Sequence, residues 1–475
     1  MAILNNTIEK GNLKKVVLLL FLWSLVVLPC CWFGYGSDED AWAVGEEAAI
    51  IWETGNYSIS RSTGFPLHEL SATILAHFGS WYATNFFSYL CGLFLAYFIY
   101  LLIKLNHFKN PLWVFGGVLF LPQVVINSSS TIDYMPSLAL FGGAYYFFVV
   151  KKYYWAAILV GISCGFRPSN GAFIIPVIAA QFIQDKDIKL ALKLFFLALL
   201  IGIICYSPVL ISYGIRSPTR EVEVPFFQYY LIGGYQALIL FGIGQSLILG
   251  GMFFYYFTTI KNVFNDSVYV RFHVLNILLW VLFFIFITCS EAEYLFPILF
   301  SVIFLADEVF DRKQFKMLVL VLISYNFFSL EMLGGESGNR KIVPRLELGF
   351  TIRDMEDRLY KQWYREATTA FKCKNKTLLM YGSMYVKADN NTQWEYSPIA
   401  KGVIKQKNGN LYLSERILDE AVLKRMKEDG FEIYVWNNRK WEYLTLKLDF
   451  WTKYVKVVYD LEAFLGSKKY GRLMQ

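Results

Sequence analysis

A cluster of acidic side chains follows the first apolar stretch of the chain. Each of these side chains could act as a base. The run is Asp38-Glu39-Asp40. A carboxylate in this setting can take the proton of an acceptor hydroxyl, and a pair of carboxylates can hold a divalent cation such as Mg²⁺ or Mn²⁺. The alternative is structural, because acids at the start of a helix suit the helix dipole. We therefore treat Asp38, Asp40 and Glu39 as candidate catalytic residues, with Asp38 and Asp40 as ligands if a metal is used.

Four arginines are candidates for binding a phosphate group. Arg61 lies in a turn segment rich in Gly and Pro, and Arg167 precedes a proline between two short apolar runs. Arg216 and Arg220 follow a longer apolar run. A planar guanidinium matches two phosphate oxygens at once, which makes arginine well suited to this task. For Arg61 a solvated loop arginine is the structural alternative.

Further polar side chains occur in the same kind of segment, beside or between apolar runs. Charges in such places are costly, so they are functional candidates by default. Helix initiation is the competing interpretation for the acids, and a structural hydrogen bond is the competing one for the histidine. These site candidates are His68, Glu69, Asp133, Glu291, Glu293 and Tyr294.

The composition indicates a membrane protein. Of 475 residues, 56% are hydrophobic and only 17% are charged, whereas soluble domains average about 25% charged residues. This excludes an ordinary cytosolic enzyme, a disordered chain and a nucleic-acid-binding domain. The whole net charge of +7 lies from Glu331 onward, and the first 330 residues are neutral overall. We expect a transmembrane domain over 1–330 and a soluble domain over 331–475.

Apolar runs predict about eleven transmembrane helices, since a crossing needs roughly 17–25 apolar residues. Several runs are short, and the pair within Tyr154–Ile183 could be one broken span. The predicted spans are Val16–Trp32, Asn85–Ile103, Pro111–Ile126, Met135–Val150, Tyr154–Phe166, Gly171–Ile183, Leu190–Ile211, Tyr230–Thr258, Val274–Thr288, Leu295–Ala306 and Met317–Leu330.

Lysines and arginines set the expected orientation, because cytoplasmic loops are enriched in them. With the N-terminus inside, all six inside segments are basic, from Lys14 and Lys15 to Arg312 and Lys313. The candidate site residues and the C-terminal domain then share the outer side. We expect a multi-pass protein of a bacterial inner membrane, with its site facing the periplasm or exterior. The net positive C-terminal domain is a hypothetical contact for anionic lipid head groups or for the acceptor.

The soluble parts have their own secondary structure signals. The long first outer loop, 33–84, predicts an interfacial helix over Glu39–Trp52 and a second helix over Leu67–Phe78. In the C-terminal region, Thr377–Tyr381 and Phe431–Trp436 predict strands, and Leu418–Asp429 predicts a helix. The expected fold is an all-α polytopic membrane bundle with a small α/β or α+β domain.

This pattern resembles the GT-C class of integral-membrane glycosyltransferases, such as protein mannosyltransferases and lipid A aminoarabinose transferases. The resemblance covers about residues 10–310. Glu293 stands where Arg is usual in the class. The motifs that carry the resemblance are Ser37-Asp-Glu-Asp40, Gly55-Asn-Tyr-Ser-Ile-Ser-Arg61, Gly64-Phe-Pro-Leu-His-Glu69, the Arg167-Pro168 turn and Glu293-Tyr-Leu-Phe-Pro297.

The resemblance implies an inverting transfer of a sugar from a polyprenyl-phosphate donor to a glycan, lipid or protein acceptor. It implies an outer-loop aspartate as general base, sometimes with a divalent metal. Asp38 matches the aspartate of the acidic pair, and Asp40 is the competing alignment. Arg61, Arg167, Arg216 and Arg220 would bind the donor phosphate. The alternatives are a transporter or flippase of lipid-linked sugars, or an O-antigen polymerase.

Overall fold

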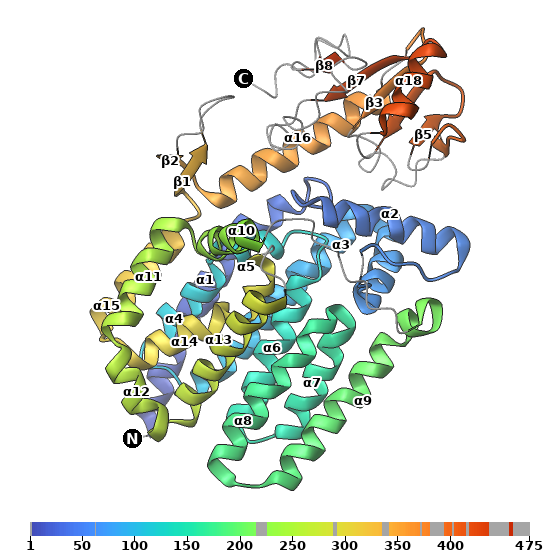
Figure 1. The fold of residues 1–475 in the computed structure, drawn as a ribbon. Coiled ribbons are helices and arrows are strands. Elements are labelled where there is room, and N and C mark those ends of the chain that lie inside the picture. Colours follow the sequence, from blue (N-terminus) through green and yellow to red (C-terminus); the bar gives the residue numbers. More distant parts are fainter. Residues whose placement is uncertain are drawn as a thin grey trace.

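The computed structural model has a helical bundle that carries a small sheet domain at one end (Figure 1). It describes residues 2–61, 63–214, 226–287, 292–334, 342–370, 373–380, 394–400, 403–414, 418–436 and 456–458.

The helices of the bundle follow one another through short connections. They are α1 (Ala2–Cys30), α2 (Glu39–Thr54), α3 (Pro66–Lys104), α4 (Pro111–Leu119), α5 (Pro122–Asn127), α6 (Tyr134–Val149), α7 (Tyr153–Phe166), the 3-10 helix η1 (Pro168–Phe173), α8 (Ile174–Asp185), α9 (Ile188–Tyr213), α10 (Phe226–Ile239), α11 (Ile243–Tyr255), α12 (Phe257–Asp266), α13 (Val268–Ile287), η2 (Ala292–Ile298), α14 (Leu299–Val309) and α15 (Arg312–Ser324).

Four of the described helices are long and apolar enough to cross a membrane. They lie at Leu13–Cys30, Pro66–Lys104, Ile188–Tyr213 and Val268–Phe286. A fifth crossing results if α10 and α11, which meet at an angle of 88°, form one broken span. The protein is therefore predominantly helical with four or five candidate membrane spans, and the other predicted crossings correspond to shorter helices.

Proline and backbone breaks explain why several predicted spans are divided. The predicted run Pro111–Ile126 forms α4 and α5, each with a proline in its first turn, where the missing N–H costs least. The pair predicted within Tyr154–Ile183 forms α7 and α8, which are separated by η1 at the Arg167-Pro168 turn. In α3 the break is at Ser80, whose φ is +52°. The predicted helix Leu67–Phe78 is the part of α3 before this break.

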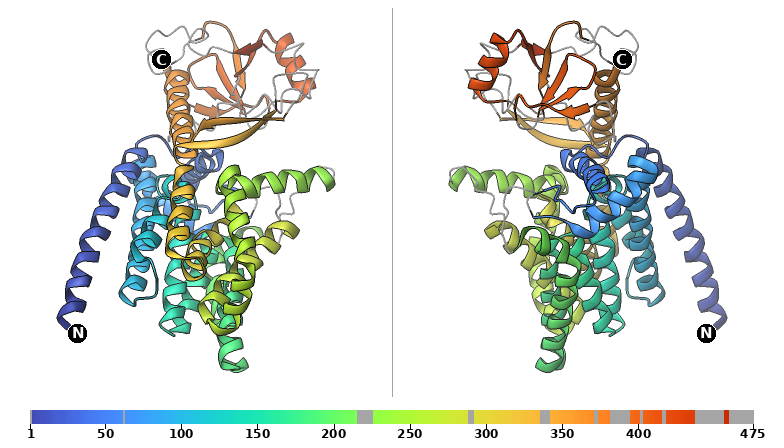
Figure 2. Two further views of the ribbon diagram at one scale, coloured as in Figure 1. Left: turned by 90° about the vertical axis from the view of Figure 1, so that its left-hand side faces the viewer. Right: turned by 90° about the vertical axis from the view of Figure 1, so that its right-hand side faces the viewer.

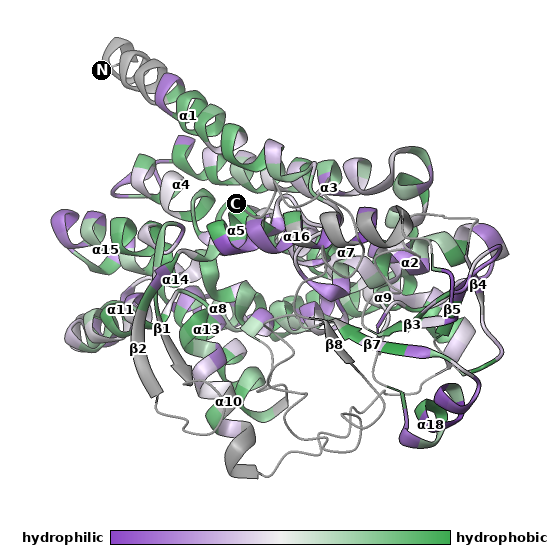
Figure 3. Ribbon diagram, turned by 90° about the horizontal axis from the view of Figure 1, so that it is seen from above, coloured by the Kyte–Doolittle hydropathy of each residue, from purple (hydrophilic) through white to green (hydrophobic). Residues whose placement is uncertain are grey.

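A hairpin and a polar helix follow the last helix of the bundle. Strands β1 (Phe328–Gly334) and β2 (Ile342–Leu348) pair antiparallel, with Phe328 opposite Leu348. The end of the predicted span Met317–Leu330 is thus a strand instead of a helix. Helix α16 (Phe350–Ala370) then crosses above the bundle and is hydrophilic for most of its length (Figure 3).

The C-terminal sheet has six described strands in the order β4-β5-β6-β3-β7-β8. Strands β6, β3, β7 and β8 are parallel, and β4 and β5 are antiparallel additions. The two predicted strands and the helix are confirmed within a residue or two. The elements are β3 (Thr377–Met380), β4 (Trp394–Tyr396), β5 (Val403–Gln406), β6 (Leu411–Ser414), α18 (Glu420–Glu428), β7 (Glu432–Trp436) and β8 (Lys456–Val458).

The sheet domain, α16 and α2 lie at the same end of the bundle. Both side views place them opposite the N-terminus of α1 (Figure 2). The turn between α8 and α9, which contains Lys186, lies at the end far from the sheet (Figure 1). Helix α2 and the C-terminal sheet therefore share one end of the bundle.

Candidate functional site

Helix α2 begins at the acidic run and separates its three members. Asp38 is the N-cap: its Oδ1 accepts a hydrogen bond from the Asp40 amide at 2.9 Å. Glu39 and Asp40 occupy the first turn, where the helix dipole favours acids. Gly55, with φ +67°, ends the helix. The helix predicted over Glu39–Trp52 is thus confirmed as a helix, and the structural interpretation fits Asp38 well.

The turn that carries Arg61 is tied down by the buried Glu69. One oxygen of the Glu69 carboxylate accepts the amide and the hydroxyl of Ser60, both at 2.7 Å. The other accepts the Phe65 amide at 3.0 Å and the Tyr57 hydroxyl. Glu69 is 1% exposed, so these bonds compensate for its lost hydration. Glu69 thus shapes the Arg61 turn, and its neighbour His68 is buried at the start of α3.

The polar segment between α5 and α6 is buried beneath the first loop and ends at Asp133. The Thr131 amide donates to the Tyr35 carbonyl at 2.7 Å, and the Thr131 hydroxyl donates to Asn85 at 2.8 Å. The Ser88 hydroxyl donates to the Ser130 carbonyl at 2.6 Å. These bonds satisfy buried polar groups that would otherwise lack partners, and they fix the position of Asp133.

Asp133 is the centre of an ion network that joins three segments far apart in sequence. Its carboxylate is paired with Arg61 through one oxygen and with Arg167 through the other, at 3.1 Å. Arg61 also bridges to Asp40 at 2.9 Å. The Asp133 side chain is fully buried and that of Arg167 is 6% exposed, whereas that of Asp40 is 44% exposed. We call Asp40, Arg61, Asp133 and Arg167 the ion network; Asp40 is its solvent-facing member.

The surroundings shift the pKa values of the two carboxylates in the network, Asp40 and Asp133, in opposite directions. Burial raises the pKa of Asp40 above its ordinary value, and Arg61 opposes this in part. Burial also acts on Asp133, but Arg61 and Arg167 together outweigh it and hold that pKa below its ordinary value. Asp133 is therefore a permanent counter-ion, and Asp40 is the more basic of the two.

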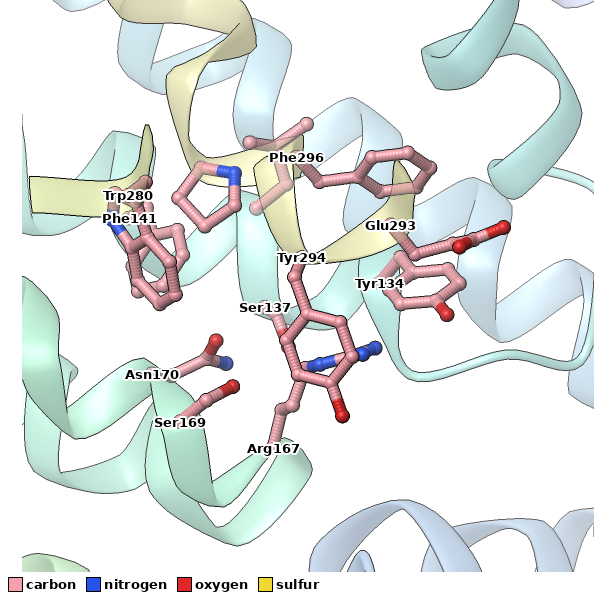
Figure 4. Close-up of a pocket in the computed structure, with 12 residues that line it drawn as sticks. Tyr134, Ser137, Phe141, Arg167, Ser169, Asn170, Trp280, Glu293, Tyr294 and Phe296 are labelled. Carbon is pink, nitrogen blue, oxygen red and sulfur yellow. The ribbon is translucent and has the colours of Figure 1, made fainter. Parts of the chain in front are cut away.

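A narrow pocket opens beside Arg167 (Figure 4). The Arg167 guanidinium lies 4.3 Å from the ring centre of Tyr294 and 4.5 Å from that of Tyr134. The cavity offers about 10 Å³ to water. The slot thus holds about one water, and a larger ligand requires wall side chains to move.

Unsatisfied polar atoms lie in this part of the site. The Trp280 indole nitrogen and the Ser169 hydroxyl are on the pocket wall, and neither has a hydrogen-bond partner among the described residues. Within the ion network, Arg61 Nε also has no hydrogen-bond partner among the described residues. Buried polar groups are rarely left unpaired in native proteins. The Trp280 and Ser169 groups could therefore be satisfied by a water or another polar group in the pocket.

Of the remaining candidate residues, two line the pocket and three lie outside the residues that the structure describes. Glu293 and Tyr294, from η2, line the pocket. Arg216, Arg220 and Glu291 lie outside the described residues. Within the described part of the chain, no group of three or more His, Cys, Asp or Glu side chains could hold a metal ion. Because Asp38 caps α2 and Asp40 pairs with Arg61, these carboxylates do not form a metal site as they stand, and we derive no step through a metal.

Sequence reasoning missed the residues of α16 that reach the site. Arg358 is fully buried and donates to the Ser129 carbonyl at 2.6 Å. Lys361 donates to the Ser37 carbonyl, and the Ser37 hydroxyl donates to Asp354. The signal that could have found them is a helical spacing of polar residues, because a search for apolar periodicity passes over it.

A search of known proteins found no matching family model, curated protein or solved structure.

Proposed function

We propose that this protein is a membrane glycosyltransferase of the GT-C kind, which moves a sugar from a polyprenyl-phosphate donor to an extracytoplasmic acceptor with inversion. The observation that carries the proposal is the ion network: two arginines share the buried carboxylate of Asp133, and a second, partly exposed carboxylate, that of Asp40, is paired with Arg61. The eleven-span topology, the bacterial inner membrane and the outward-facing site belong to the same proposal.

The roles follow from charge and exposure. The acceptor hydroxyl attacks the anomeric carbon while Asp40 takes its proton, and the bond from that carbon to the phosphate oxygen breaks. The electron pair leaves with polyprenyl phosphate, whose charge Arg61 and Arg167 stabilise. The pocket beside Arg167, with the unpaired Trp280 and Ser169 groups, would admit sugar hydroxyls once its wall side chains move.

Asp40 takes the role that the family alignment also permits for Asp38. The Asp38 carboxylate is occupied by the cap of α2, whereas the Asp40 carboxylate faces Arg61. Asp40 also has the raised pKa that improves a general base. Glu39, the third acid of the run, occupies the first turn of α2.

The test is transfer from a labelled polyprenyl-phosphate sugar by the full-length protein in lipid nanodiscs. We expect release of polyprenyl phosphate, and a loss on the order of 10²–10⁴-fold in Asp40→Asn. Asp38→Asn is a sharp comparison, because asparagine caps a helix about as well as aspartate. Glu53→Gln, an exposed change on the same helix, is the control and should keep the wild-type rate. Wild-type transfer by Asp40→Asn would show that Asp40 is not the general base. Loss of transfer in Asp38→Asn alone would show that Asp38 is the base.

One feature favours a transporter of lipid-linked sugars as the second candidate. Helices α10 and α11 meet at 88°, and broken helices of this kind form the substrate sites of many transporters. A panel of polyprenyl-phosphate sugars in proteoliposomes distinguishes the two. Movement of the labelled lipid between leaflets without release of polyprenyl phosphate would favour the transporter, and release would favour the transferase.

A further inference from the structure

Helix α16 buries a stripe of polar side chains against the bundle. Every member of the stripe is less than 10% exposed. The spacing of three and four residues places them on one face of the helix. Helices normally bury apolar residues in this pattern, and buried charges are costly unless they are well paired. The stripe consists of Thr351, Asp354, Arg358, Lys361 and Arg365.

Arg358 binds the backbone of the segment that leads to Asp133. Its Nη1 donates to the Ser129 carbonyl at 2.6 Å, and its Nη2 donates to the Ile126 carbonyl at 3.1 Å. Its Nε donates to Asp354 at 2.7 Å, which completes the fork. A fully buried guanidinium with this many acceptors is fixed in orientation. The segment it holds ends a few residues later at the central carboxylate of the ion network.

Asp354 and Lys361 bind the segment that leads to Asp40. Lys361 Nζ donates to the Ser37 carbonyl, and Asp354 accepts from the Ser37 hydroxyl. Ser37 directly precedes Asp38, the cap of α2. One face of α16 thus touches the backbone just before both acidic segments of the site. The hydrogen bond from the Thr131 amide to the Tyr35 carbonyl, at 2.7 Å, joins these two segments directly.

We propose that α16 positions the site: Arg358, with Asp354 and Lys361, holds the Asp40 and Asp133 segments at the separation that lets both carboxylates share Arg61. Arg358 is a positioning residue, since it touches neither the arginines nor the pocket in the described contacts. The consequence for catalysis rests on the proposed function. The consequence for structure does not, because it concerns only how two loops are held.

The experiment compares Arg358→Gln with Arg353→Gln in the full-length protein. Arg353 lies on the same helix and donates a hydrogen bond to the Ser329 hydroxyl of the hairpin, at 3.3 Å. We expect Arg358→Gln to speed amide hydrogen exchange in peptides that cover 33–40 and 126–133. We also expect it to lower kcat on the order of 10²-fold, as a displacement of about 1 Å can do, with KM for the donor changed much less. Arg353→Gln should show neither effect.

Amide hydrogen exchange and kinetics together distinguish the positioning role of α16 from the proposed glycosyltransferase function. Faster exchange at both peptides without any transferase activity in the wild type would keep the positioning role and overturn the glycosyltransferase. Unchanged exchange in Arg358→Gln would overturn the positioning role, whatever the activity. Should Arg358→Gln fail to fold, Lys361→Met decides: faster exchange at 33–40 supports the proposal, and wild-type exchange there overturns it. Partial rescue of kcat by Arg358→Lys, which keeps the charge, is the expected mark of positioning.

Discussion

Asp40 and Asp133 are bound by the same arginine, yet they are suited to different tasks. Asp133 is fully buried between Arg61 and Arg167, which keep it ionised. Asp40 is partly exposed and is ion-paired with Arg61. A carboxylate that is basic and reachable can accept a proton, whereas one locked between two guanidinium groups can only organise charge.

This contrast predicts a shift in the pH profile when Arg61 is replaced. Burial raises the pKa of Asp40 and Arg61 lowers it, so Arg61→Gln leaves burial unopposed and the pKa rises further. A general base must be deprotonated, so the rate falls as the pH drops through this pKa. The acid limb of kcat/KM should therefore move to higher pH in Arg61→Gln. Arg353→Gln removes a charge outside the ion network and should leave the acid limb unchanged. An acid limb that does not move in either variant would exclude Asp40 as the base.

Glu69 predicts a stability effect with a functional consequence. Its carboxylate accepts four hydrogen bonds in the Arg61 turn. Glu69→Gln replaces one acceptor oxygen with a donor, so two of these groups lose their partner in a buried place. We expect a loss of about 1–3 kcal/mol, seen as a lower thermal unfolding midpoint in detergent, together with weaker transfer. Glu53→Gln, at an exposed position of α2, should change neither quantity, and an equal midpoint for both variants would contradict the role of Glu69.

The sequence placed these acids in the right segments but could not rank them. Asp38 and Asp40 are two positions apart, so on a helix they point in different directions. Which of them faces Arg61 depends on where α2 begins and on a turn that Glu69 folds from further along the chain. Which aspartate faces Arg61 therefore depends on tertiary contacts, and these cannot be read from a single sequence.

At the scale of elements, hydropathy located helices better than it located membrane spans. All six residues of α5 are buried, so the apolar character of its run reflects the protein interior as much as contact with lipid. A window of hydropathy does not distinguish these two environments. Helix α16 was missed for the opposite reason. Its buried face carries charged residues at helical spacing, and their partners lie in loops hundreds of residues away.

Helices α7 and α9 predict a packing effect that needs no knowledge of function. A Cβ on Gly161 would lie 2.8 Å from the Ala198 carbonyl oxygen and 2.7 Å from the Ile201 Cβ. Small residues allow such close approach between membrane helices. Gly161→Ala should therefore destabilise the fold by about 1–3 kcal/mol, as overpacking does.

Gly250 of α11 provides the matched control, since a Cβ there would meet nothing within 4 Å. Alanine favours a helix over glycine by up to about 1 kcal/mol, so Gly250→Ala should leave the thermal midpoint equal or slightly higher. Midpoints measured in the same detergent compare the two variants directly. A Gly161→Ala protein as stable as Gly250→Ala would show that α7 and α9 are not packed this closely.

The distribution of charge over the whole molecule predicts which end of the bundle faces which compartment. The basic turn between α8 and α9 lies at the end away from α2 and the C-terminal sheet (Figure 1). Basic loops remain on the cytoplasmic side, so α2, the ion network and the C-terminal domain should face outward together. Their shared side is a property of the fold, because α16 is bonded to the segment that precedes α2.

Single cysteines at exposed positions test this orientation. Glu53→Cys on α2 and Lys427→Cys on α18 should react with a membrane-impermeant thiol reagent in intact cells, and Lys189→Cys at the start of α9 should react only after lysis. All three side chains are exposed, and the unaltered protein gives the background from the native cysteines. Reaction of Lys189→Cys alone would reverse the orientation and place the site in the cytoplasm. Reaction of Lys189→Cys and Glu53→Cys from the same side would contradict the bundle's passage through the membrane between them.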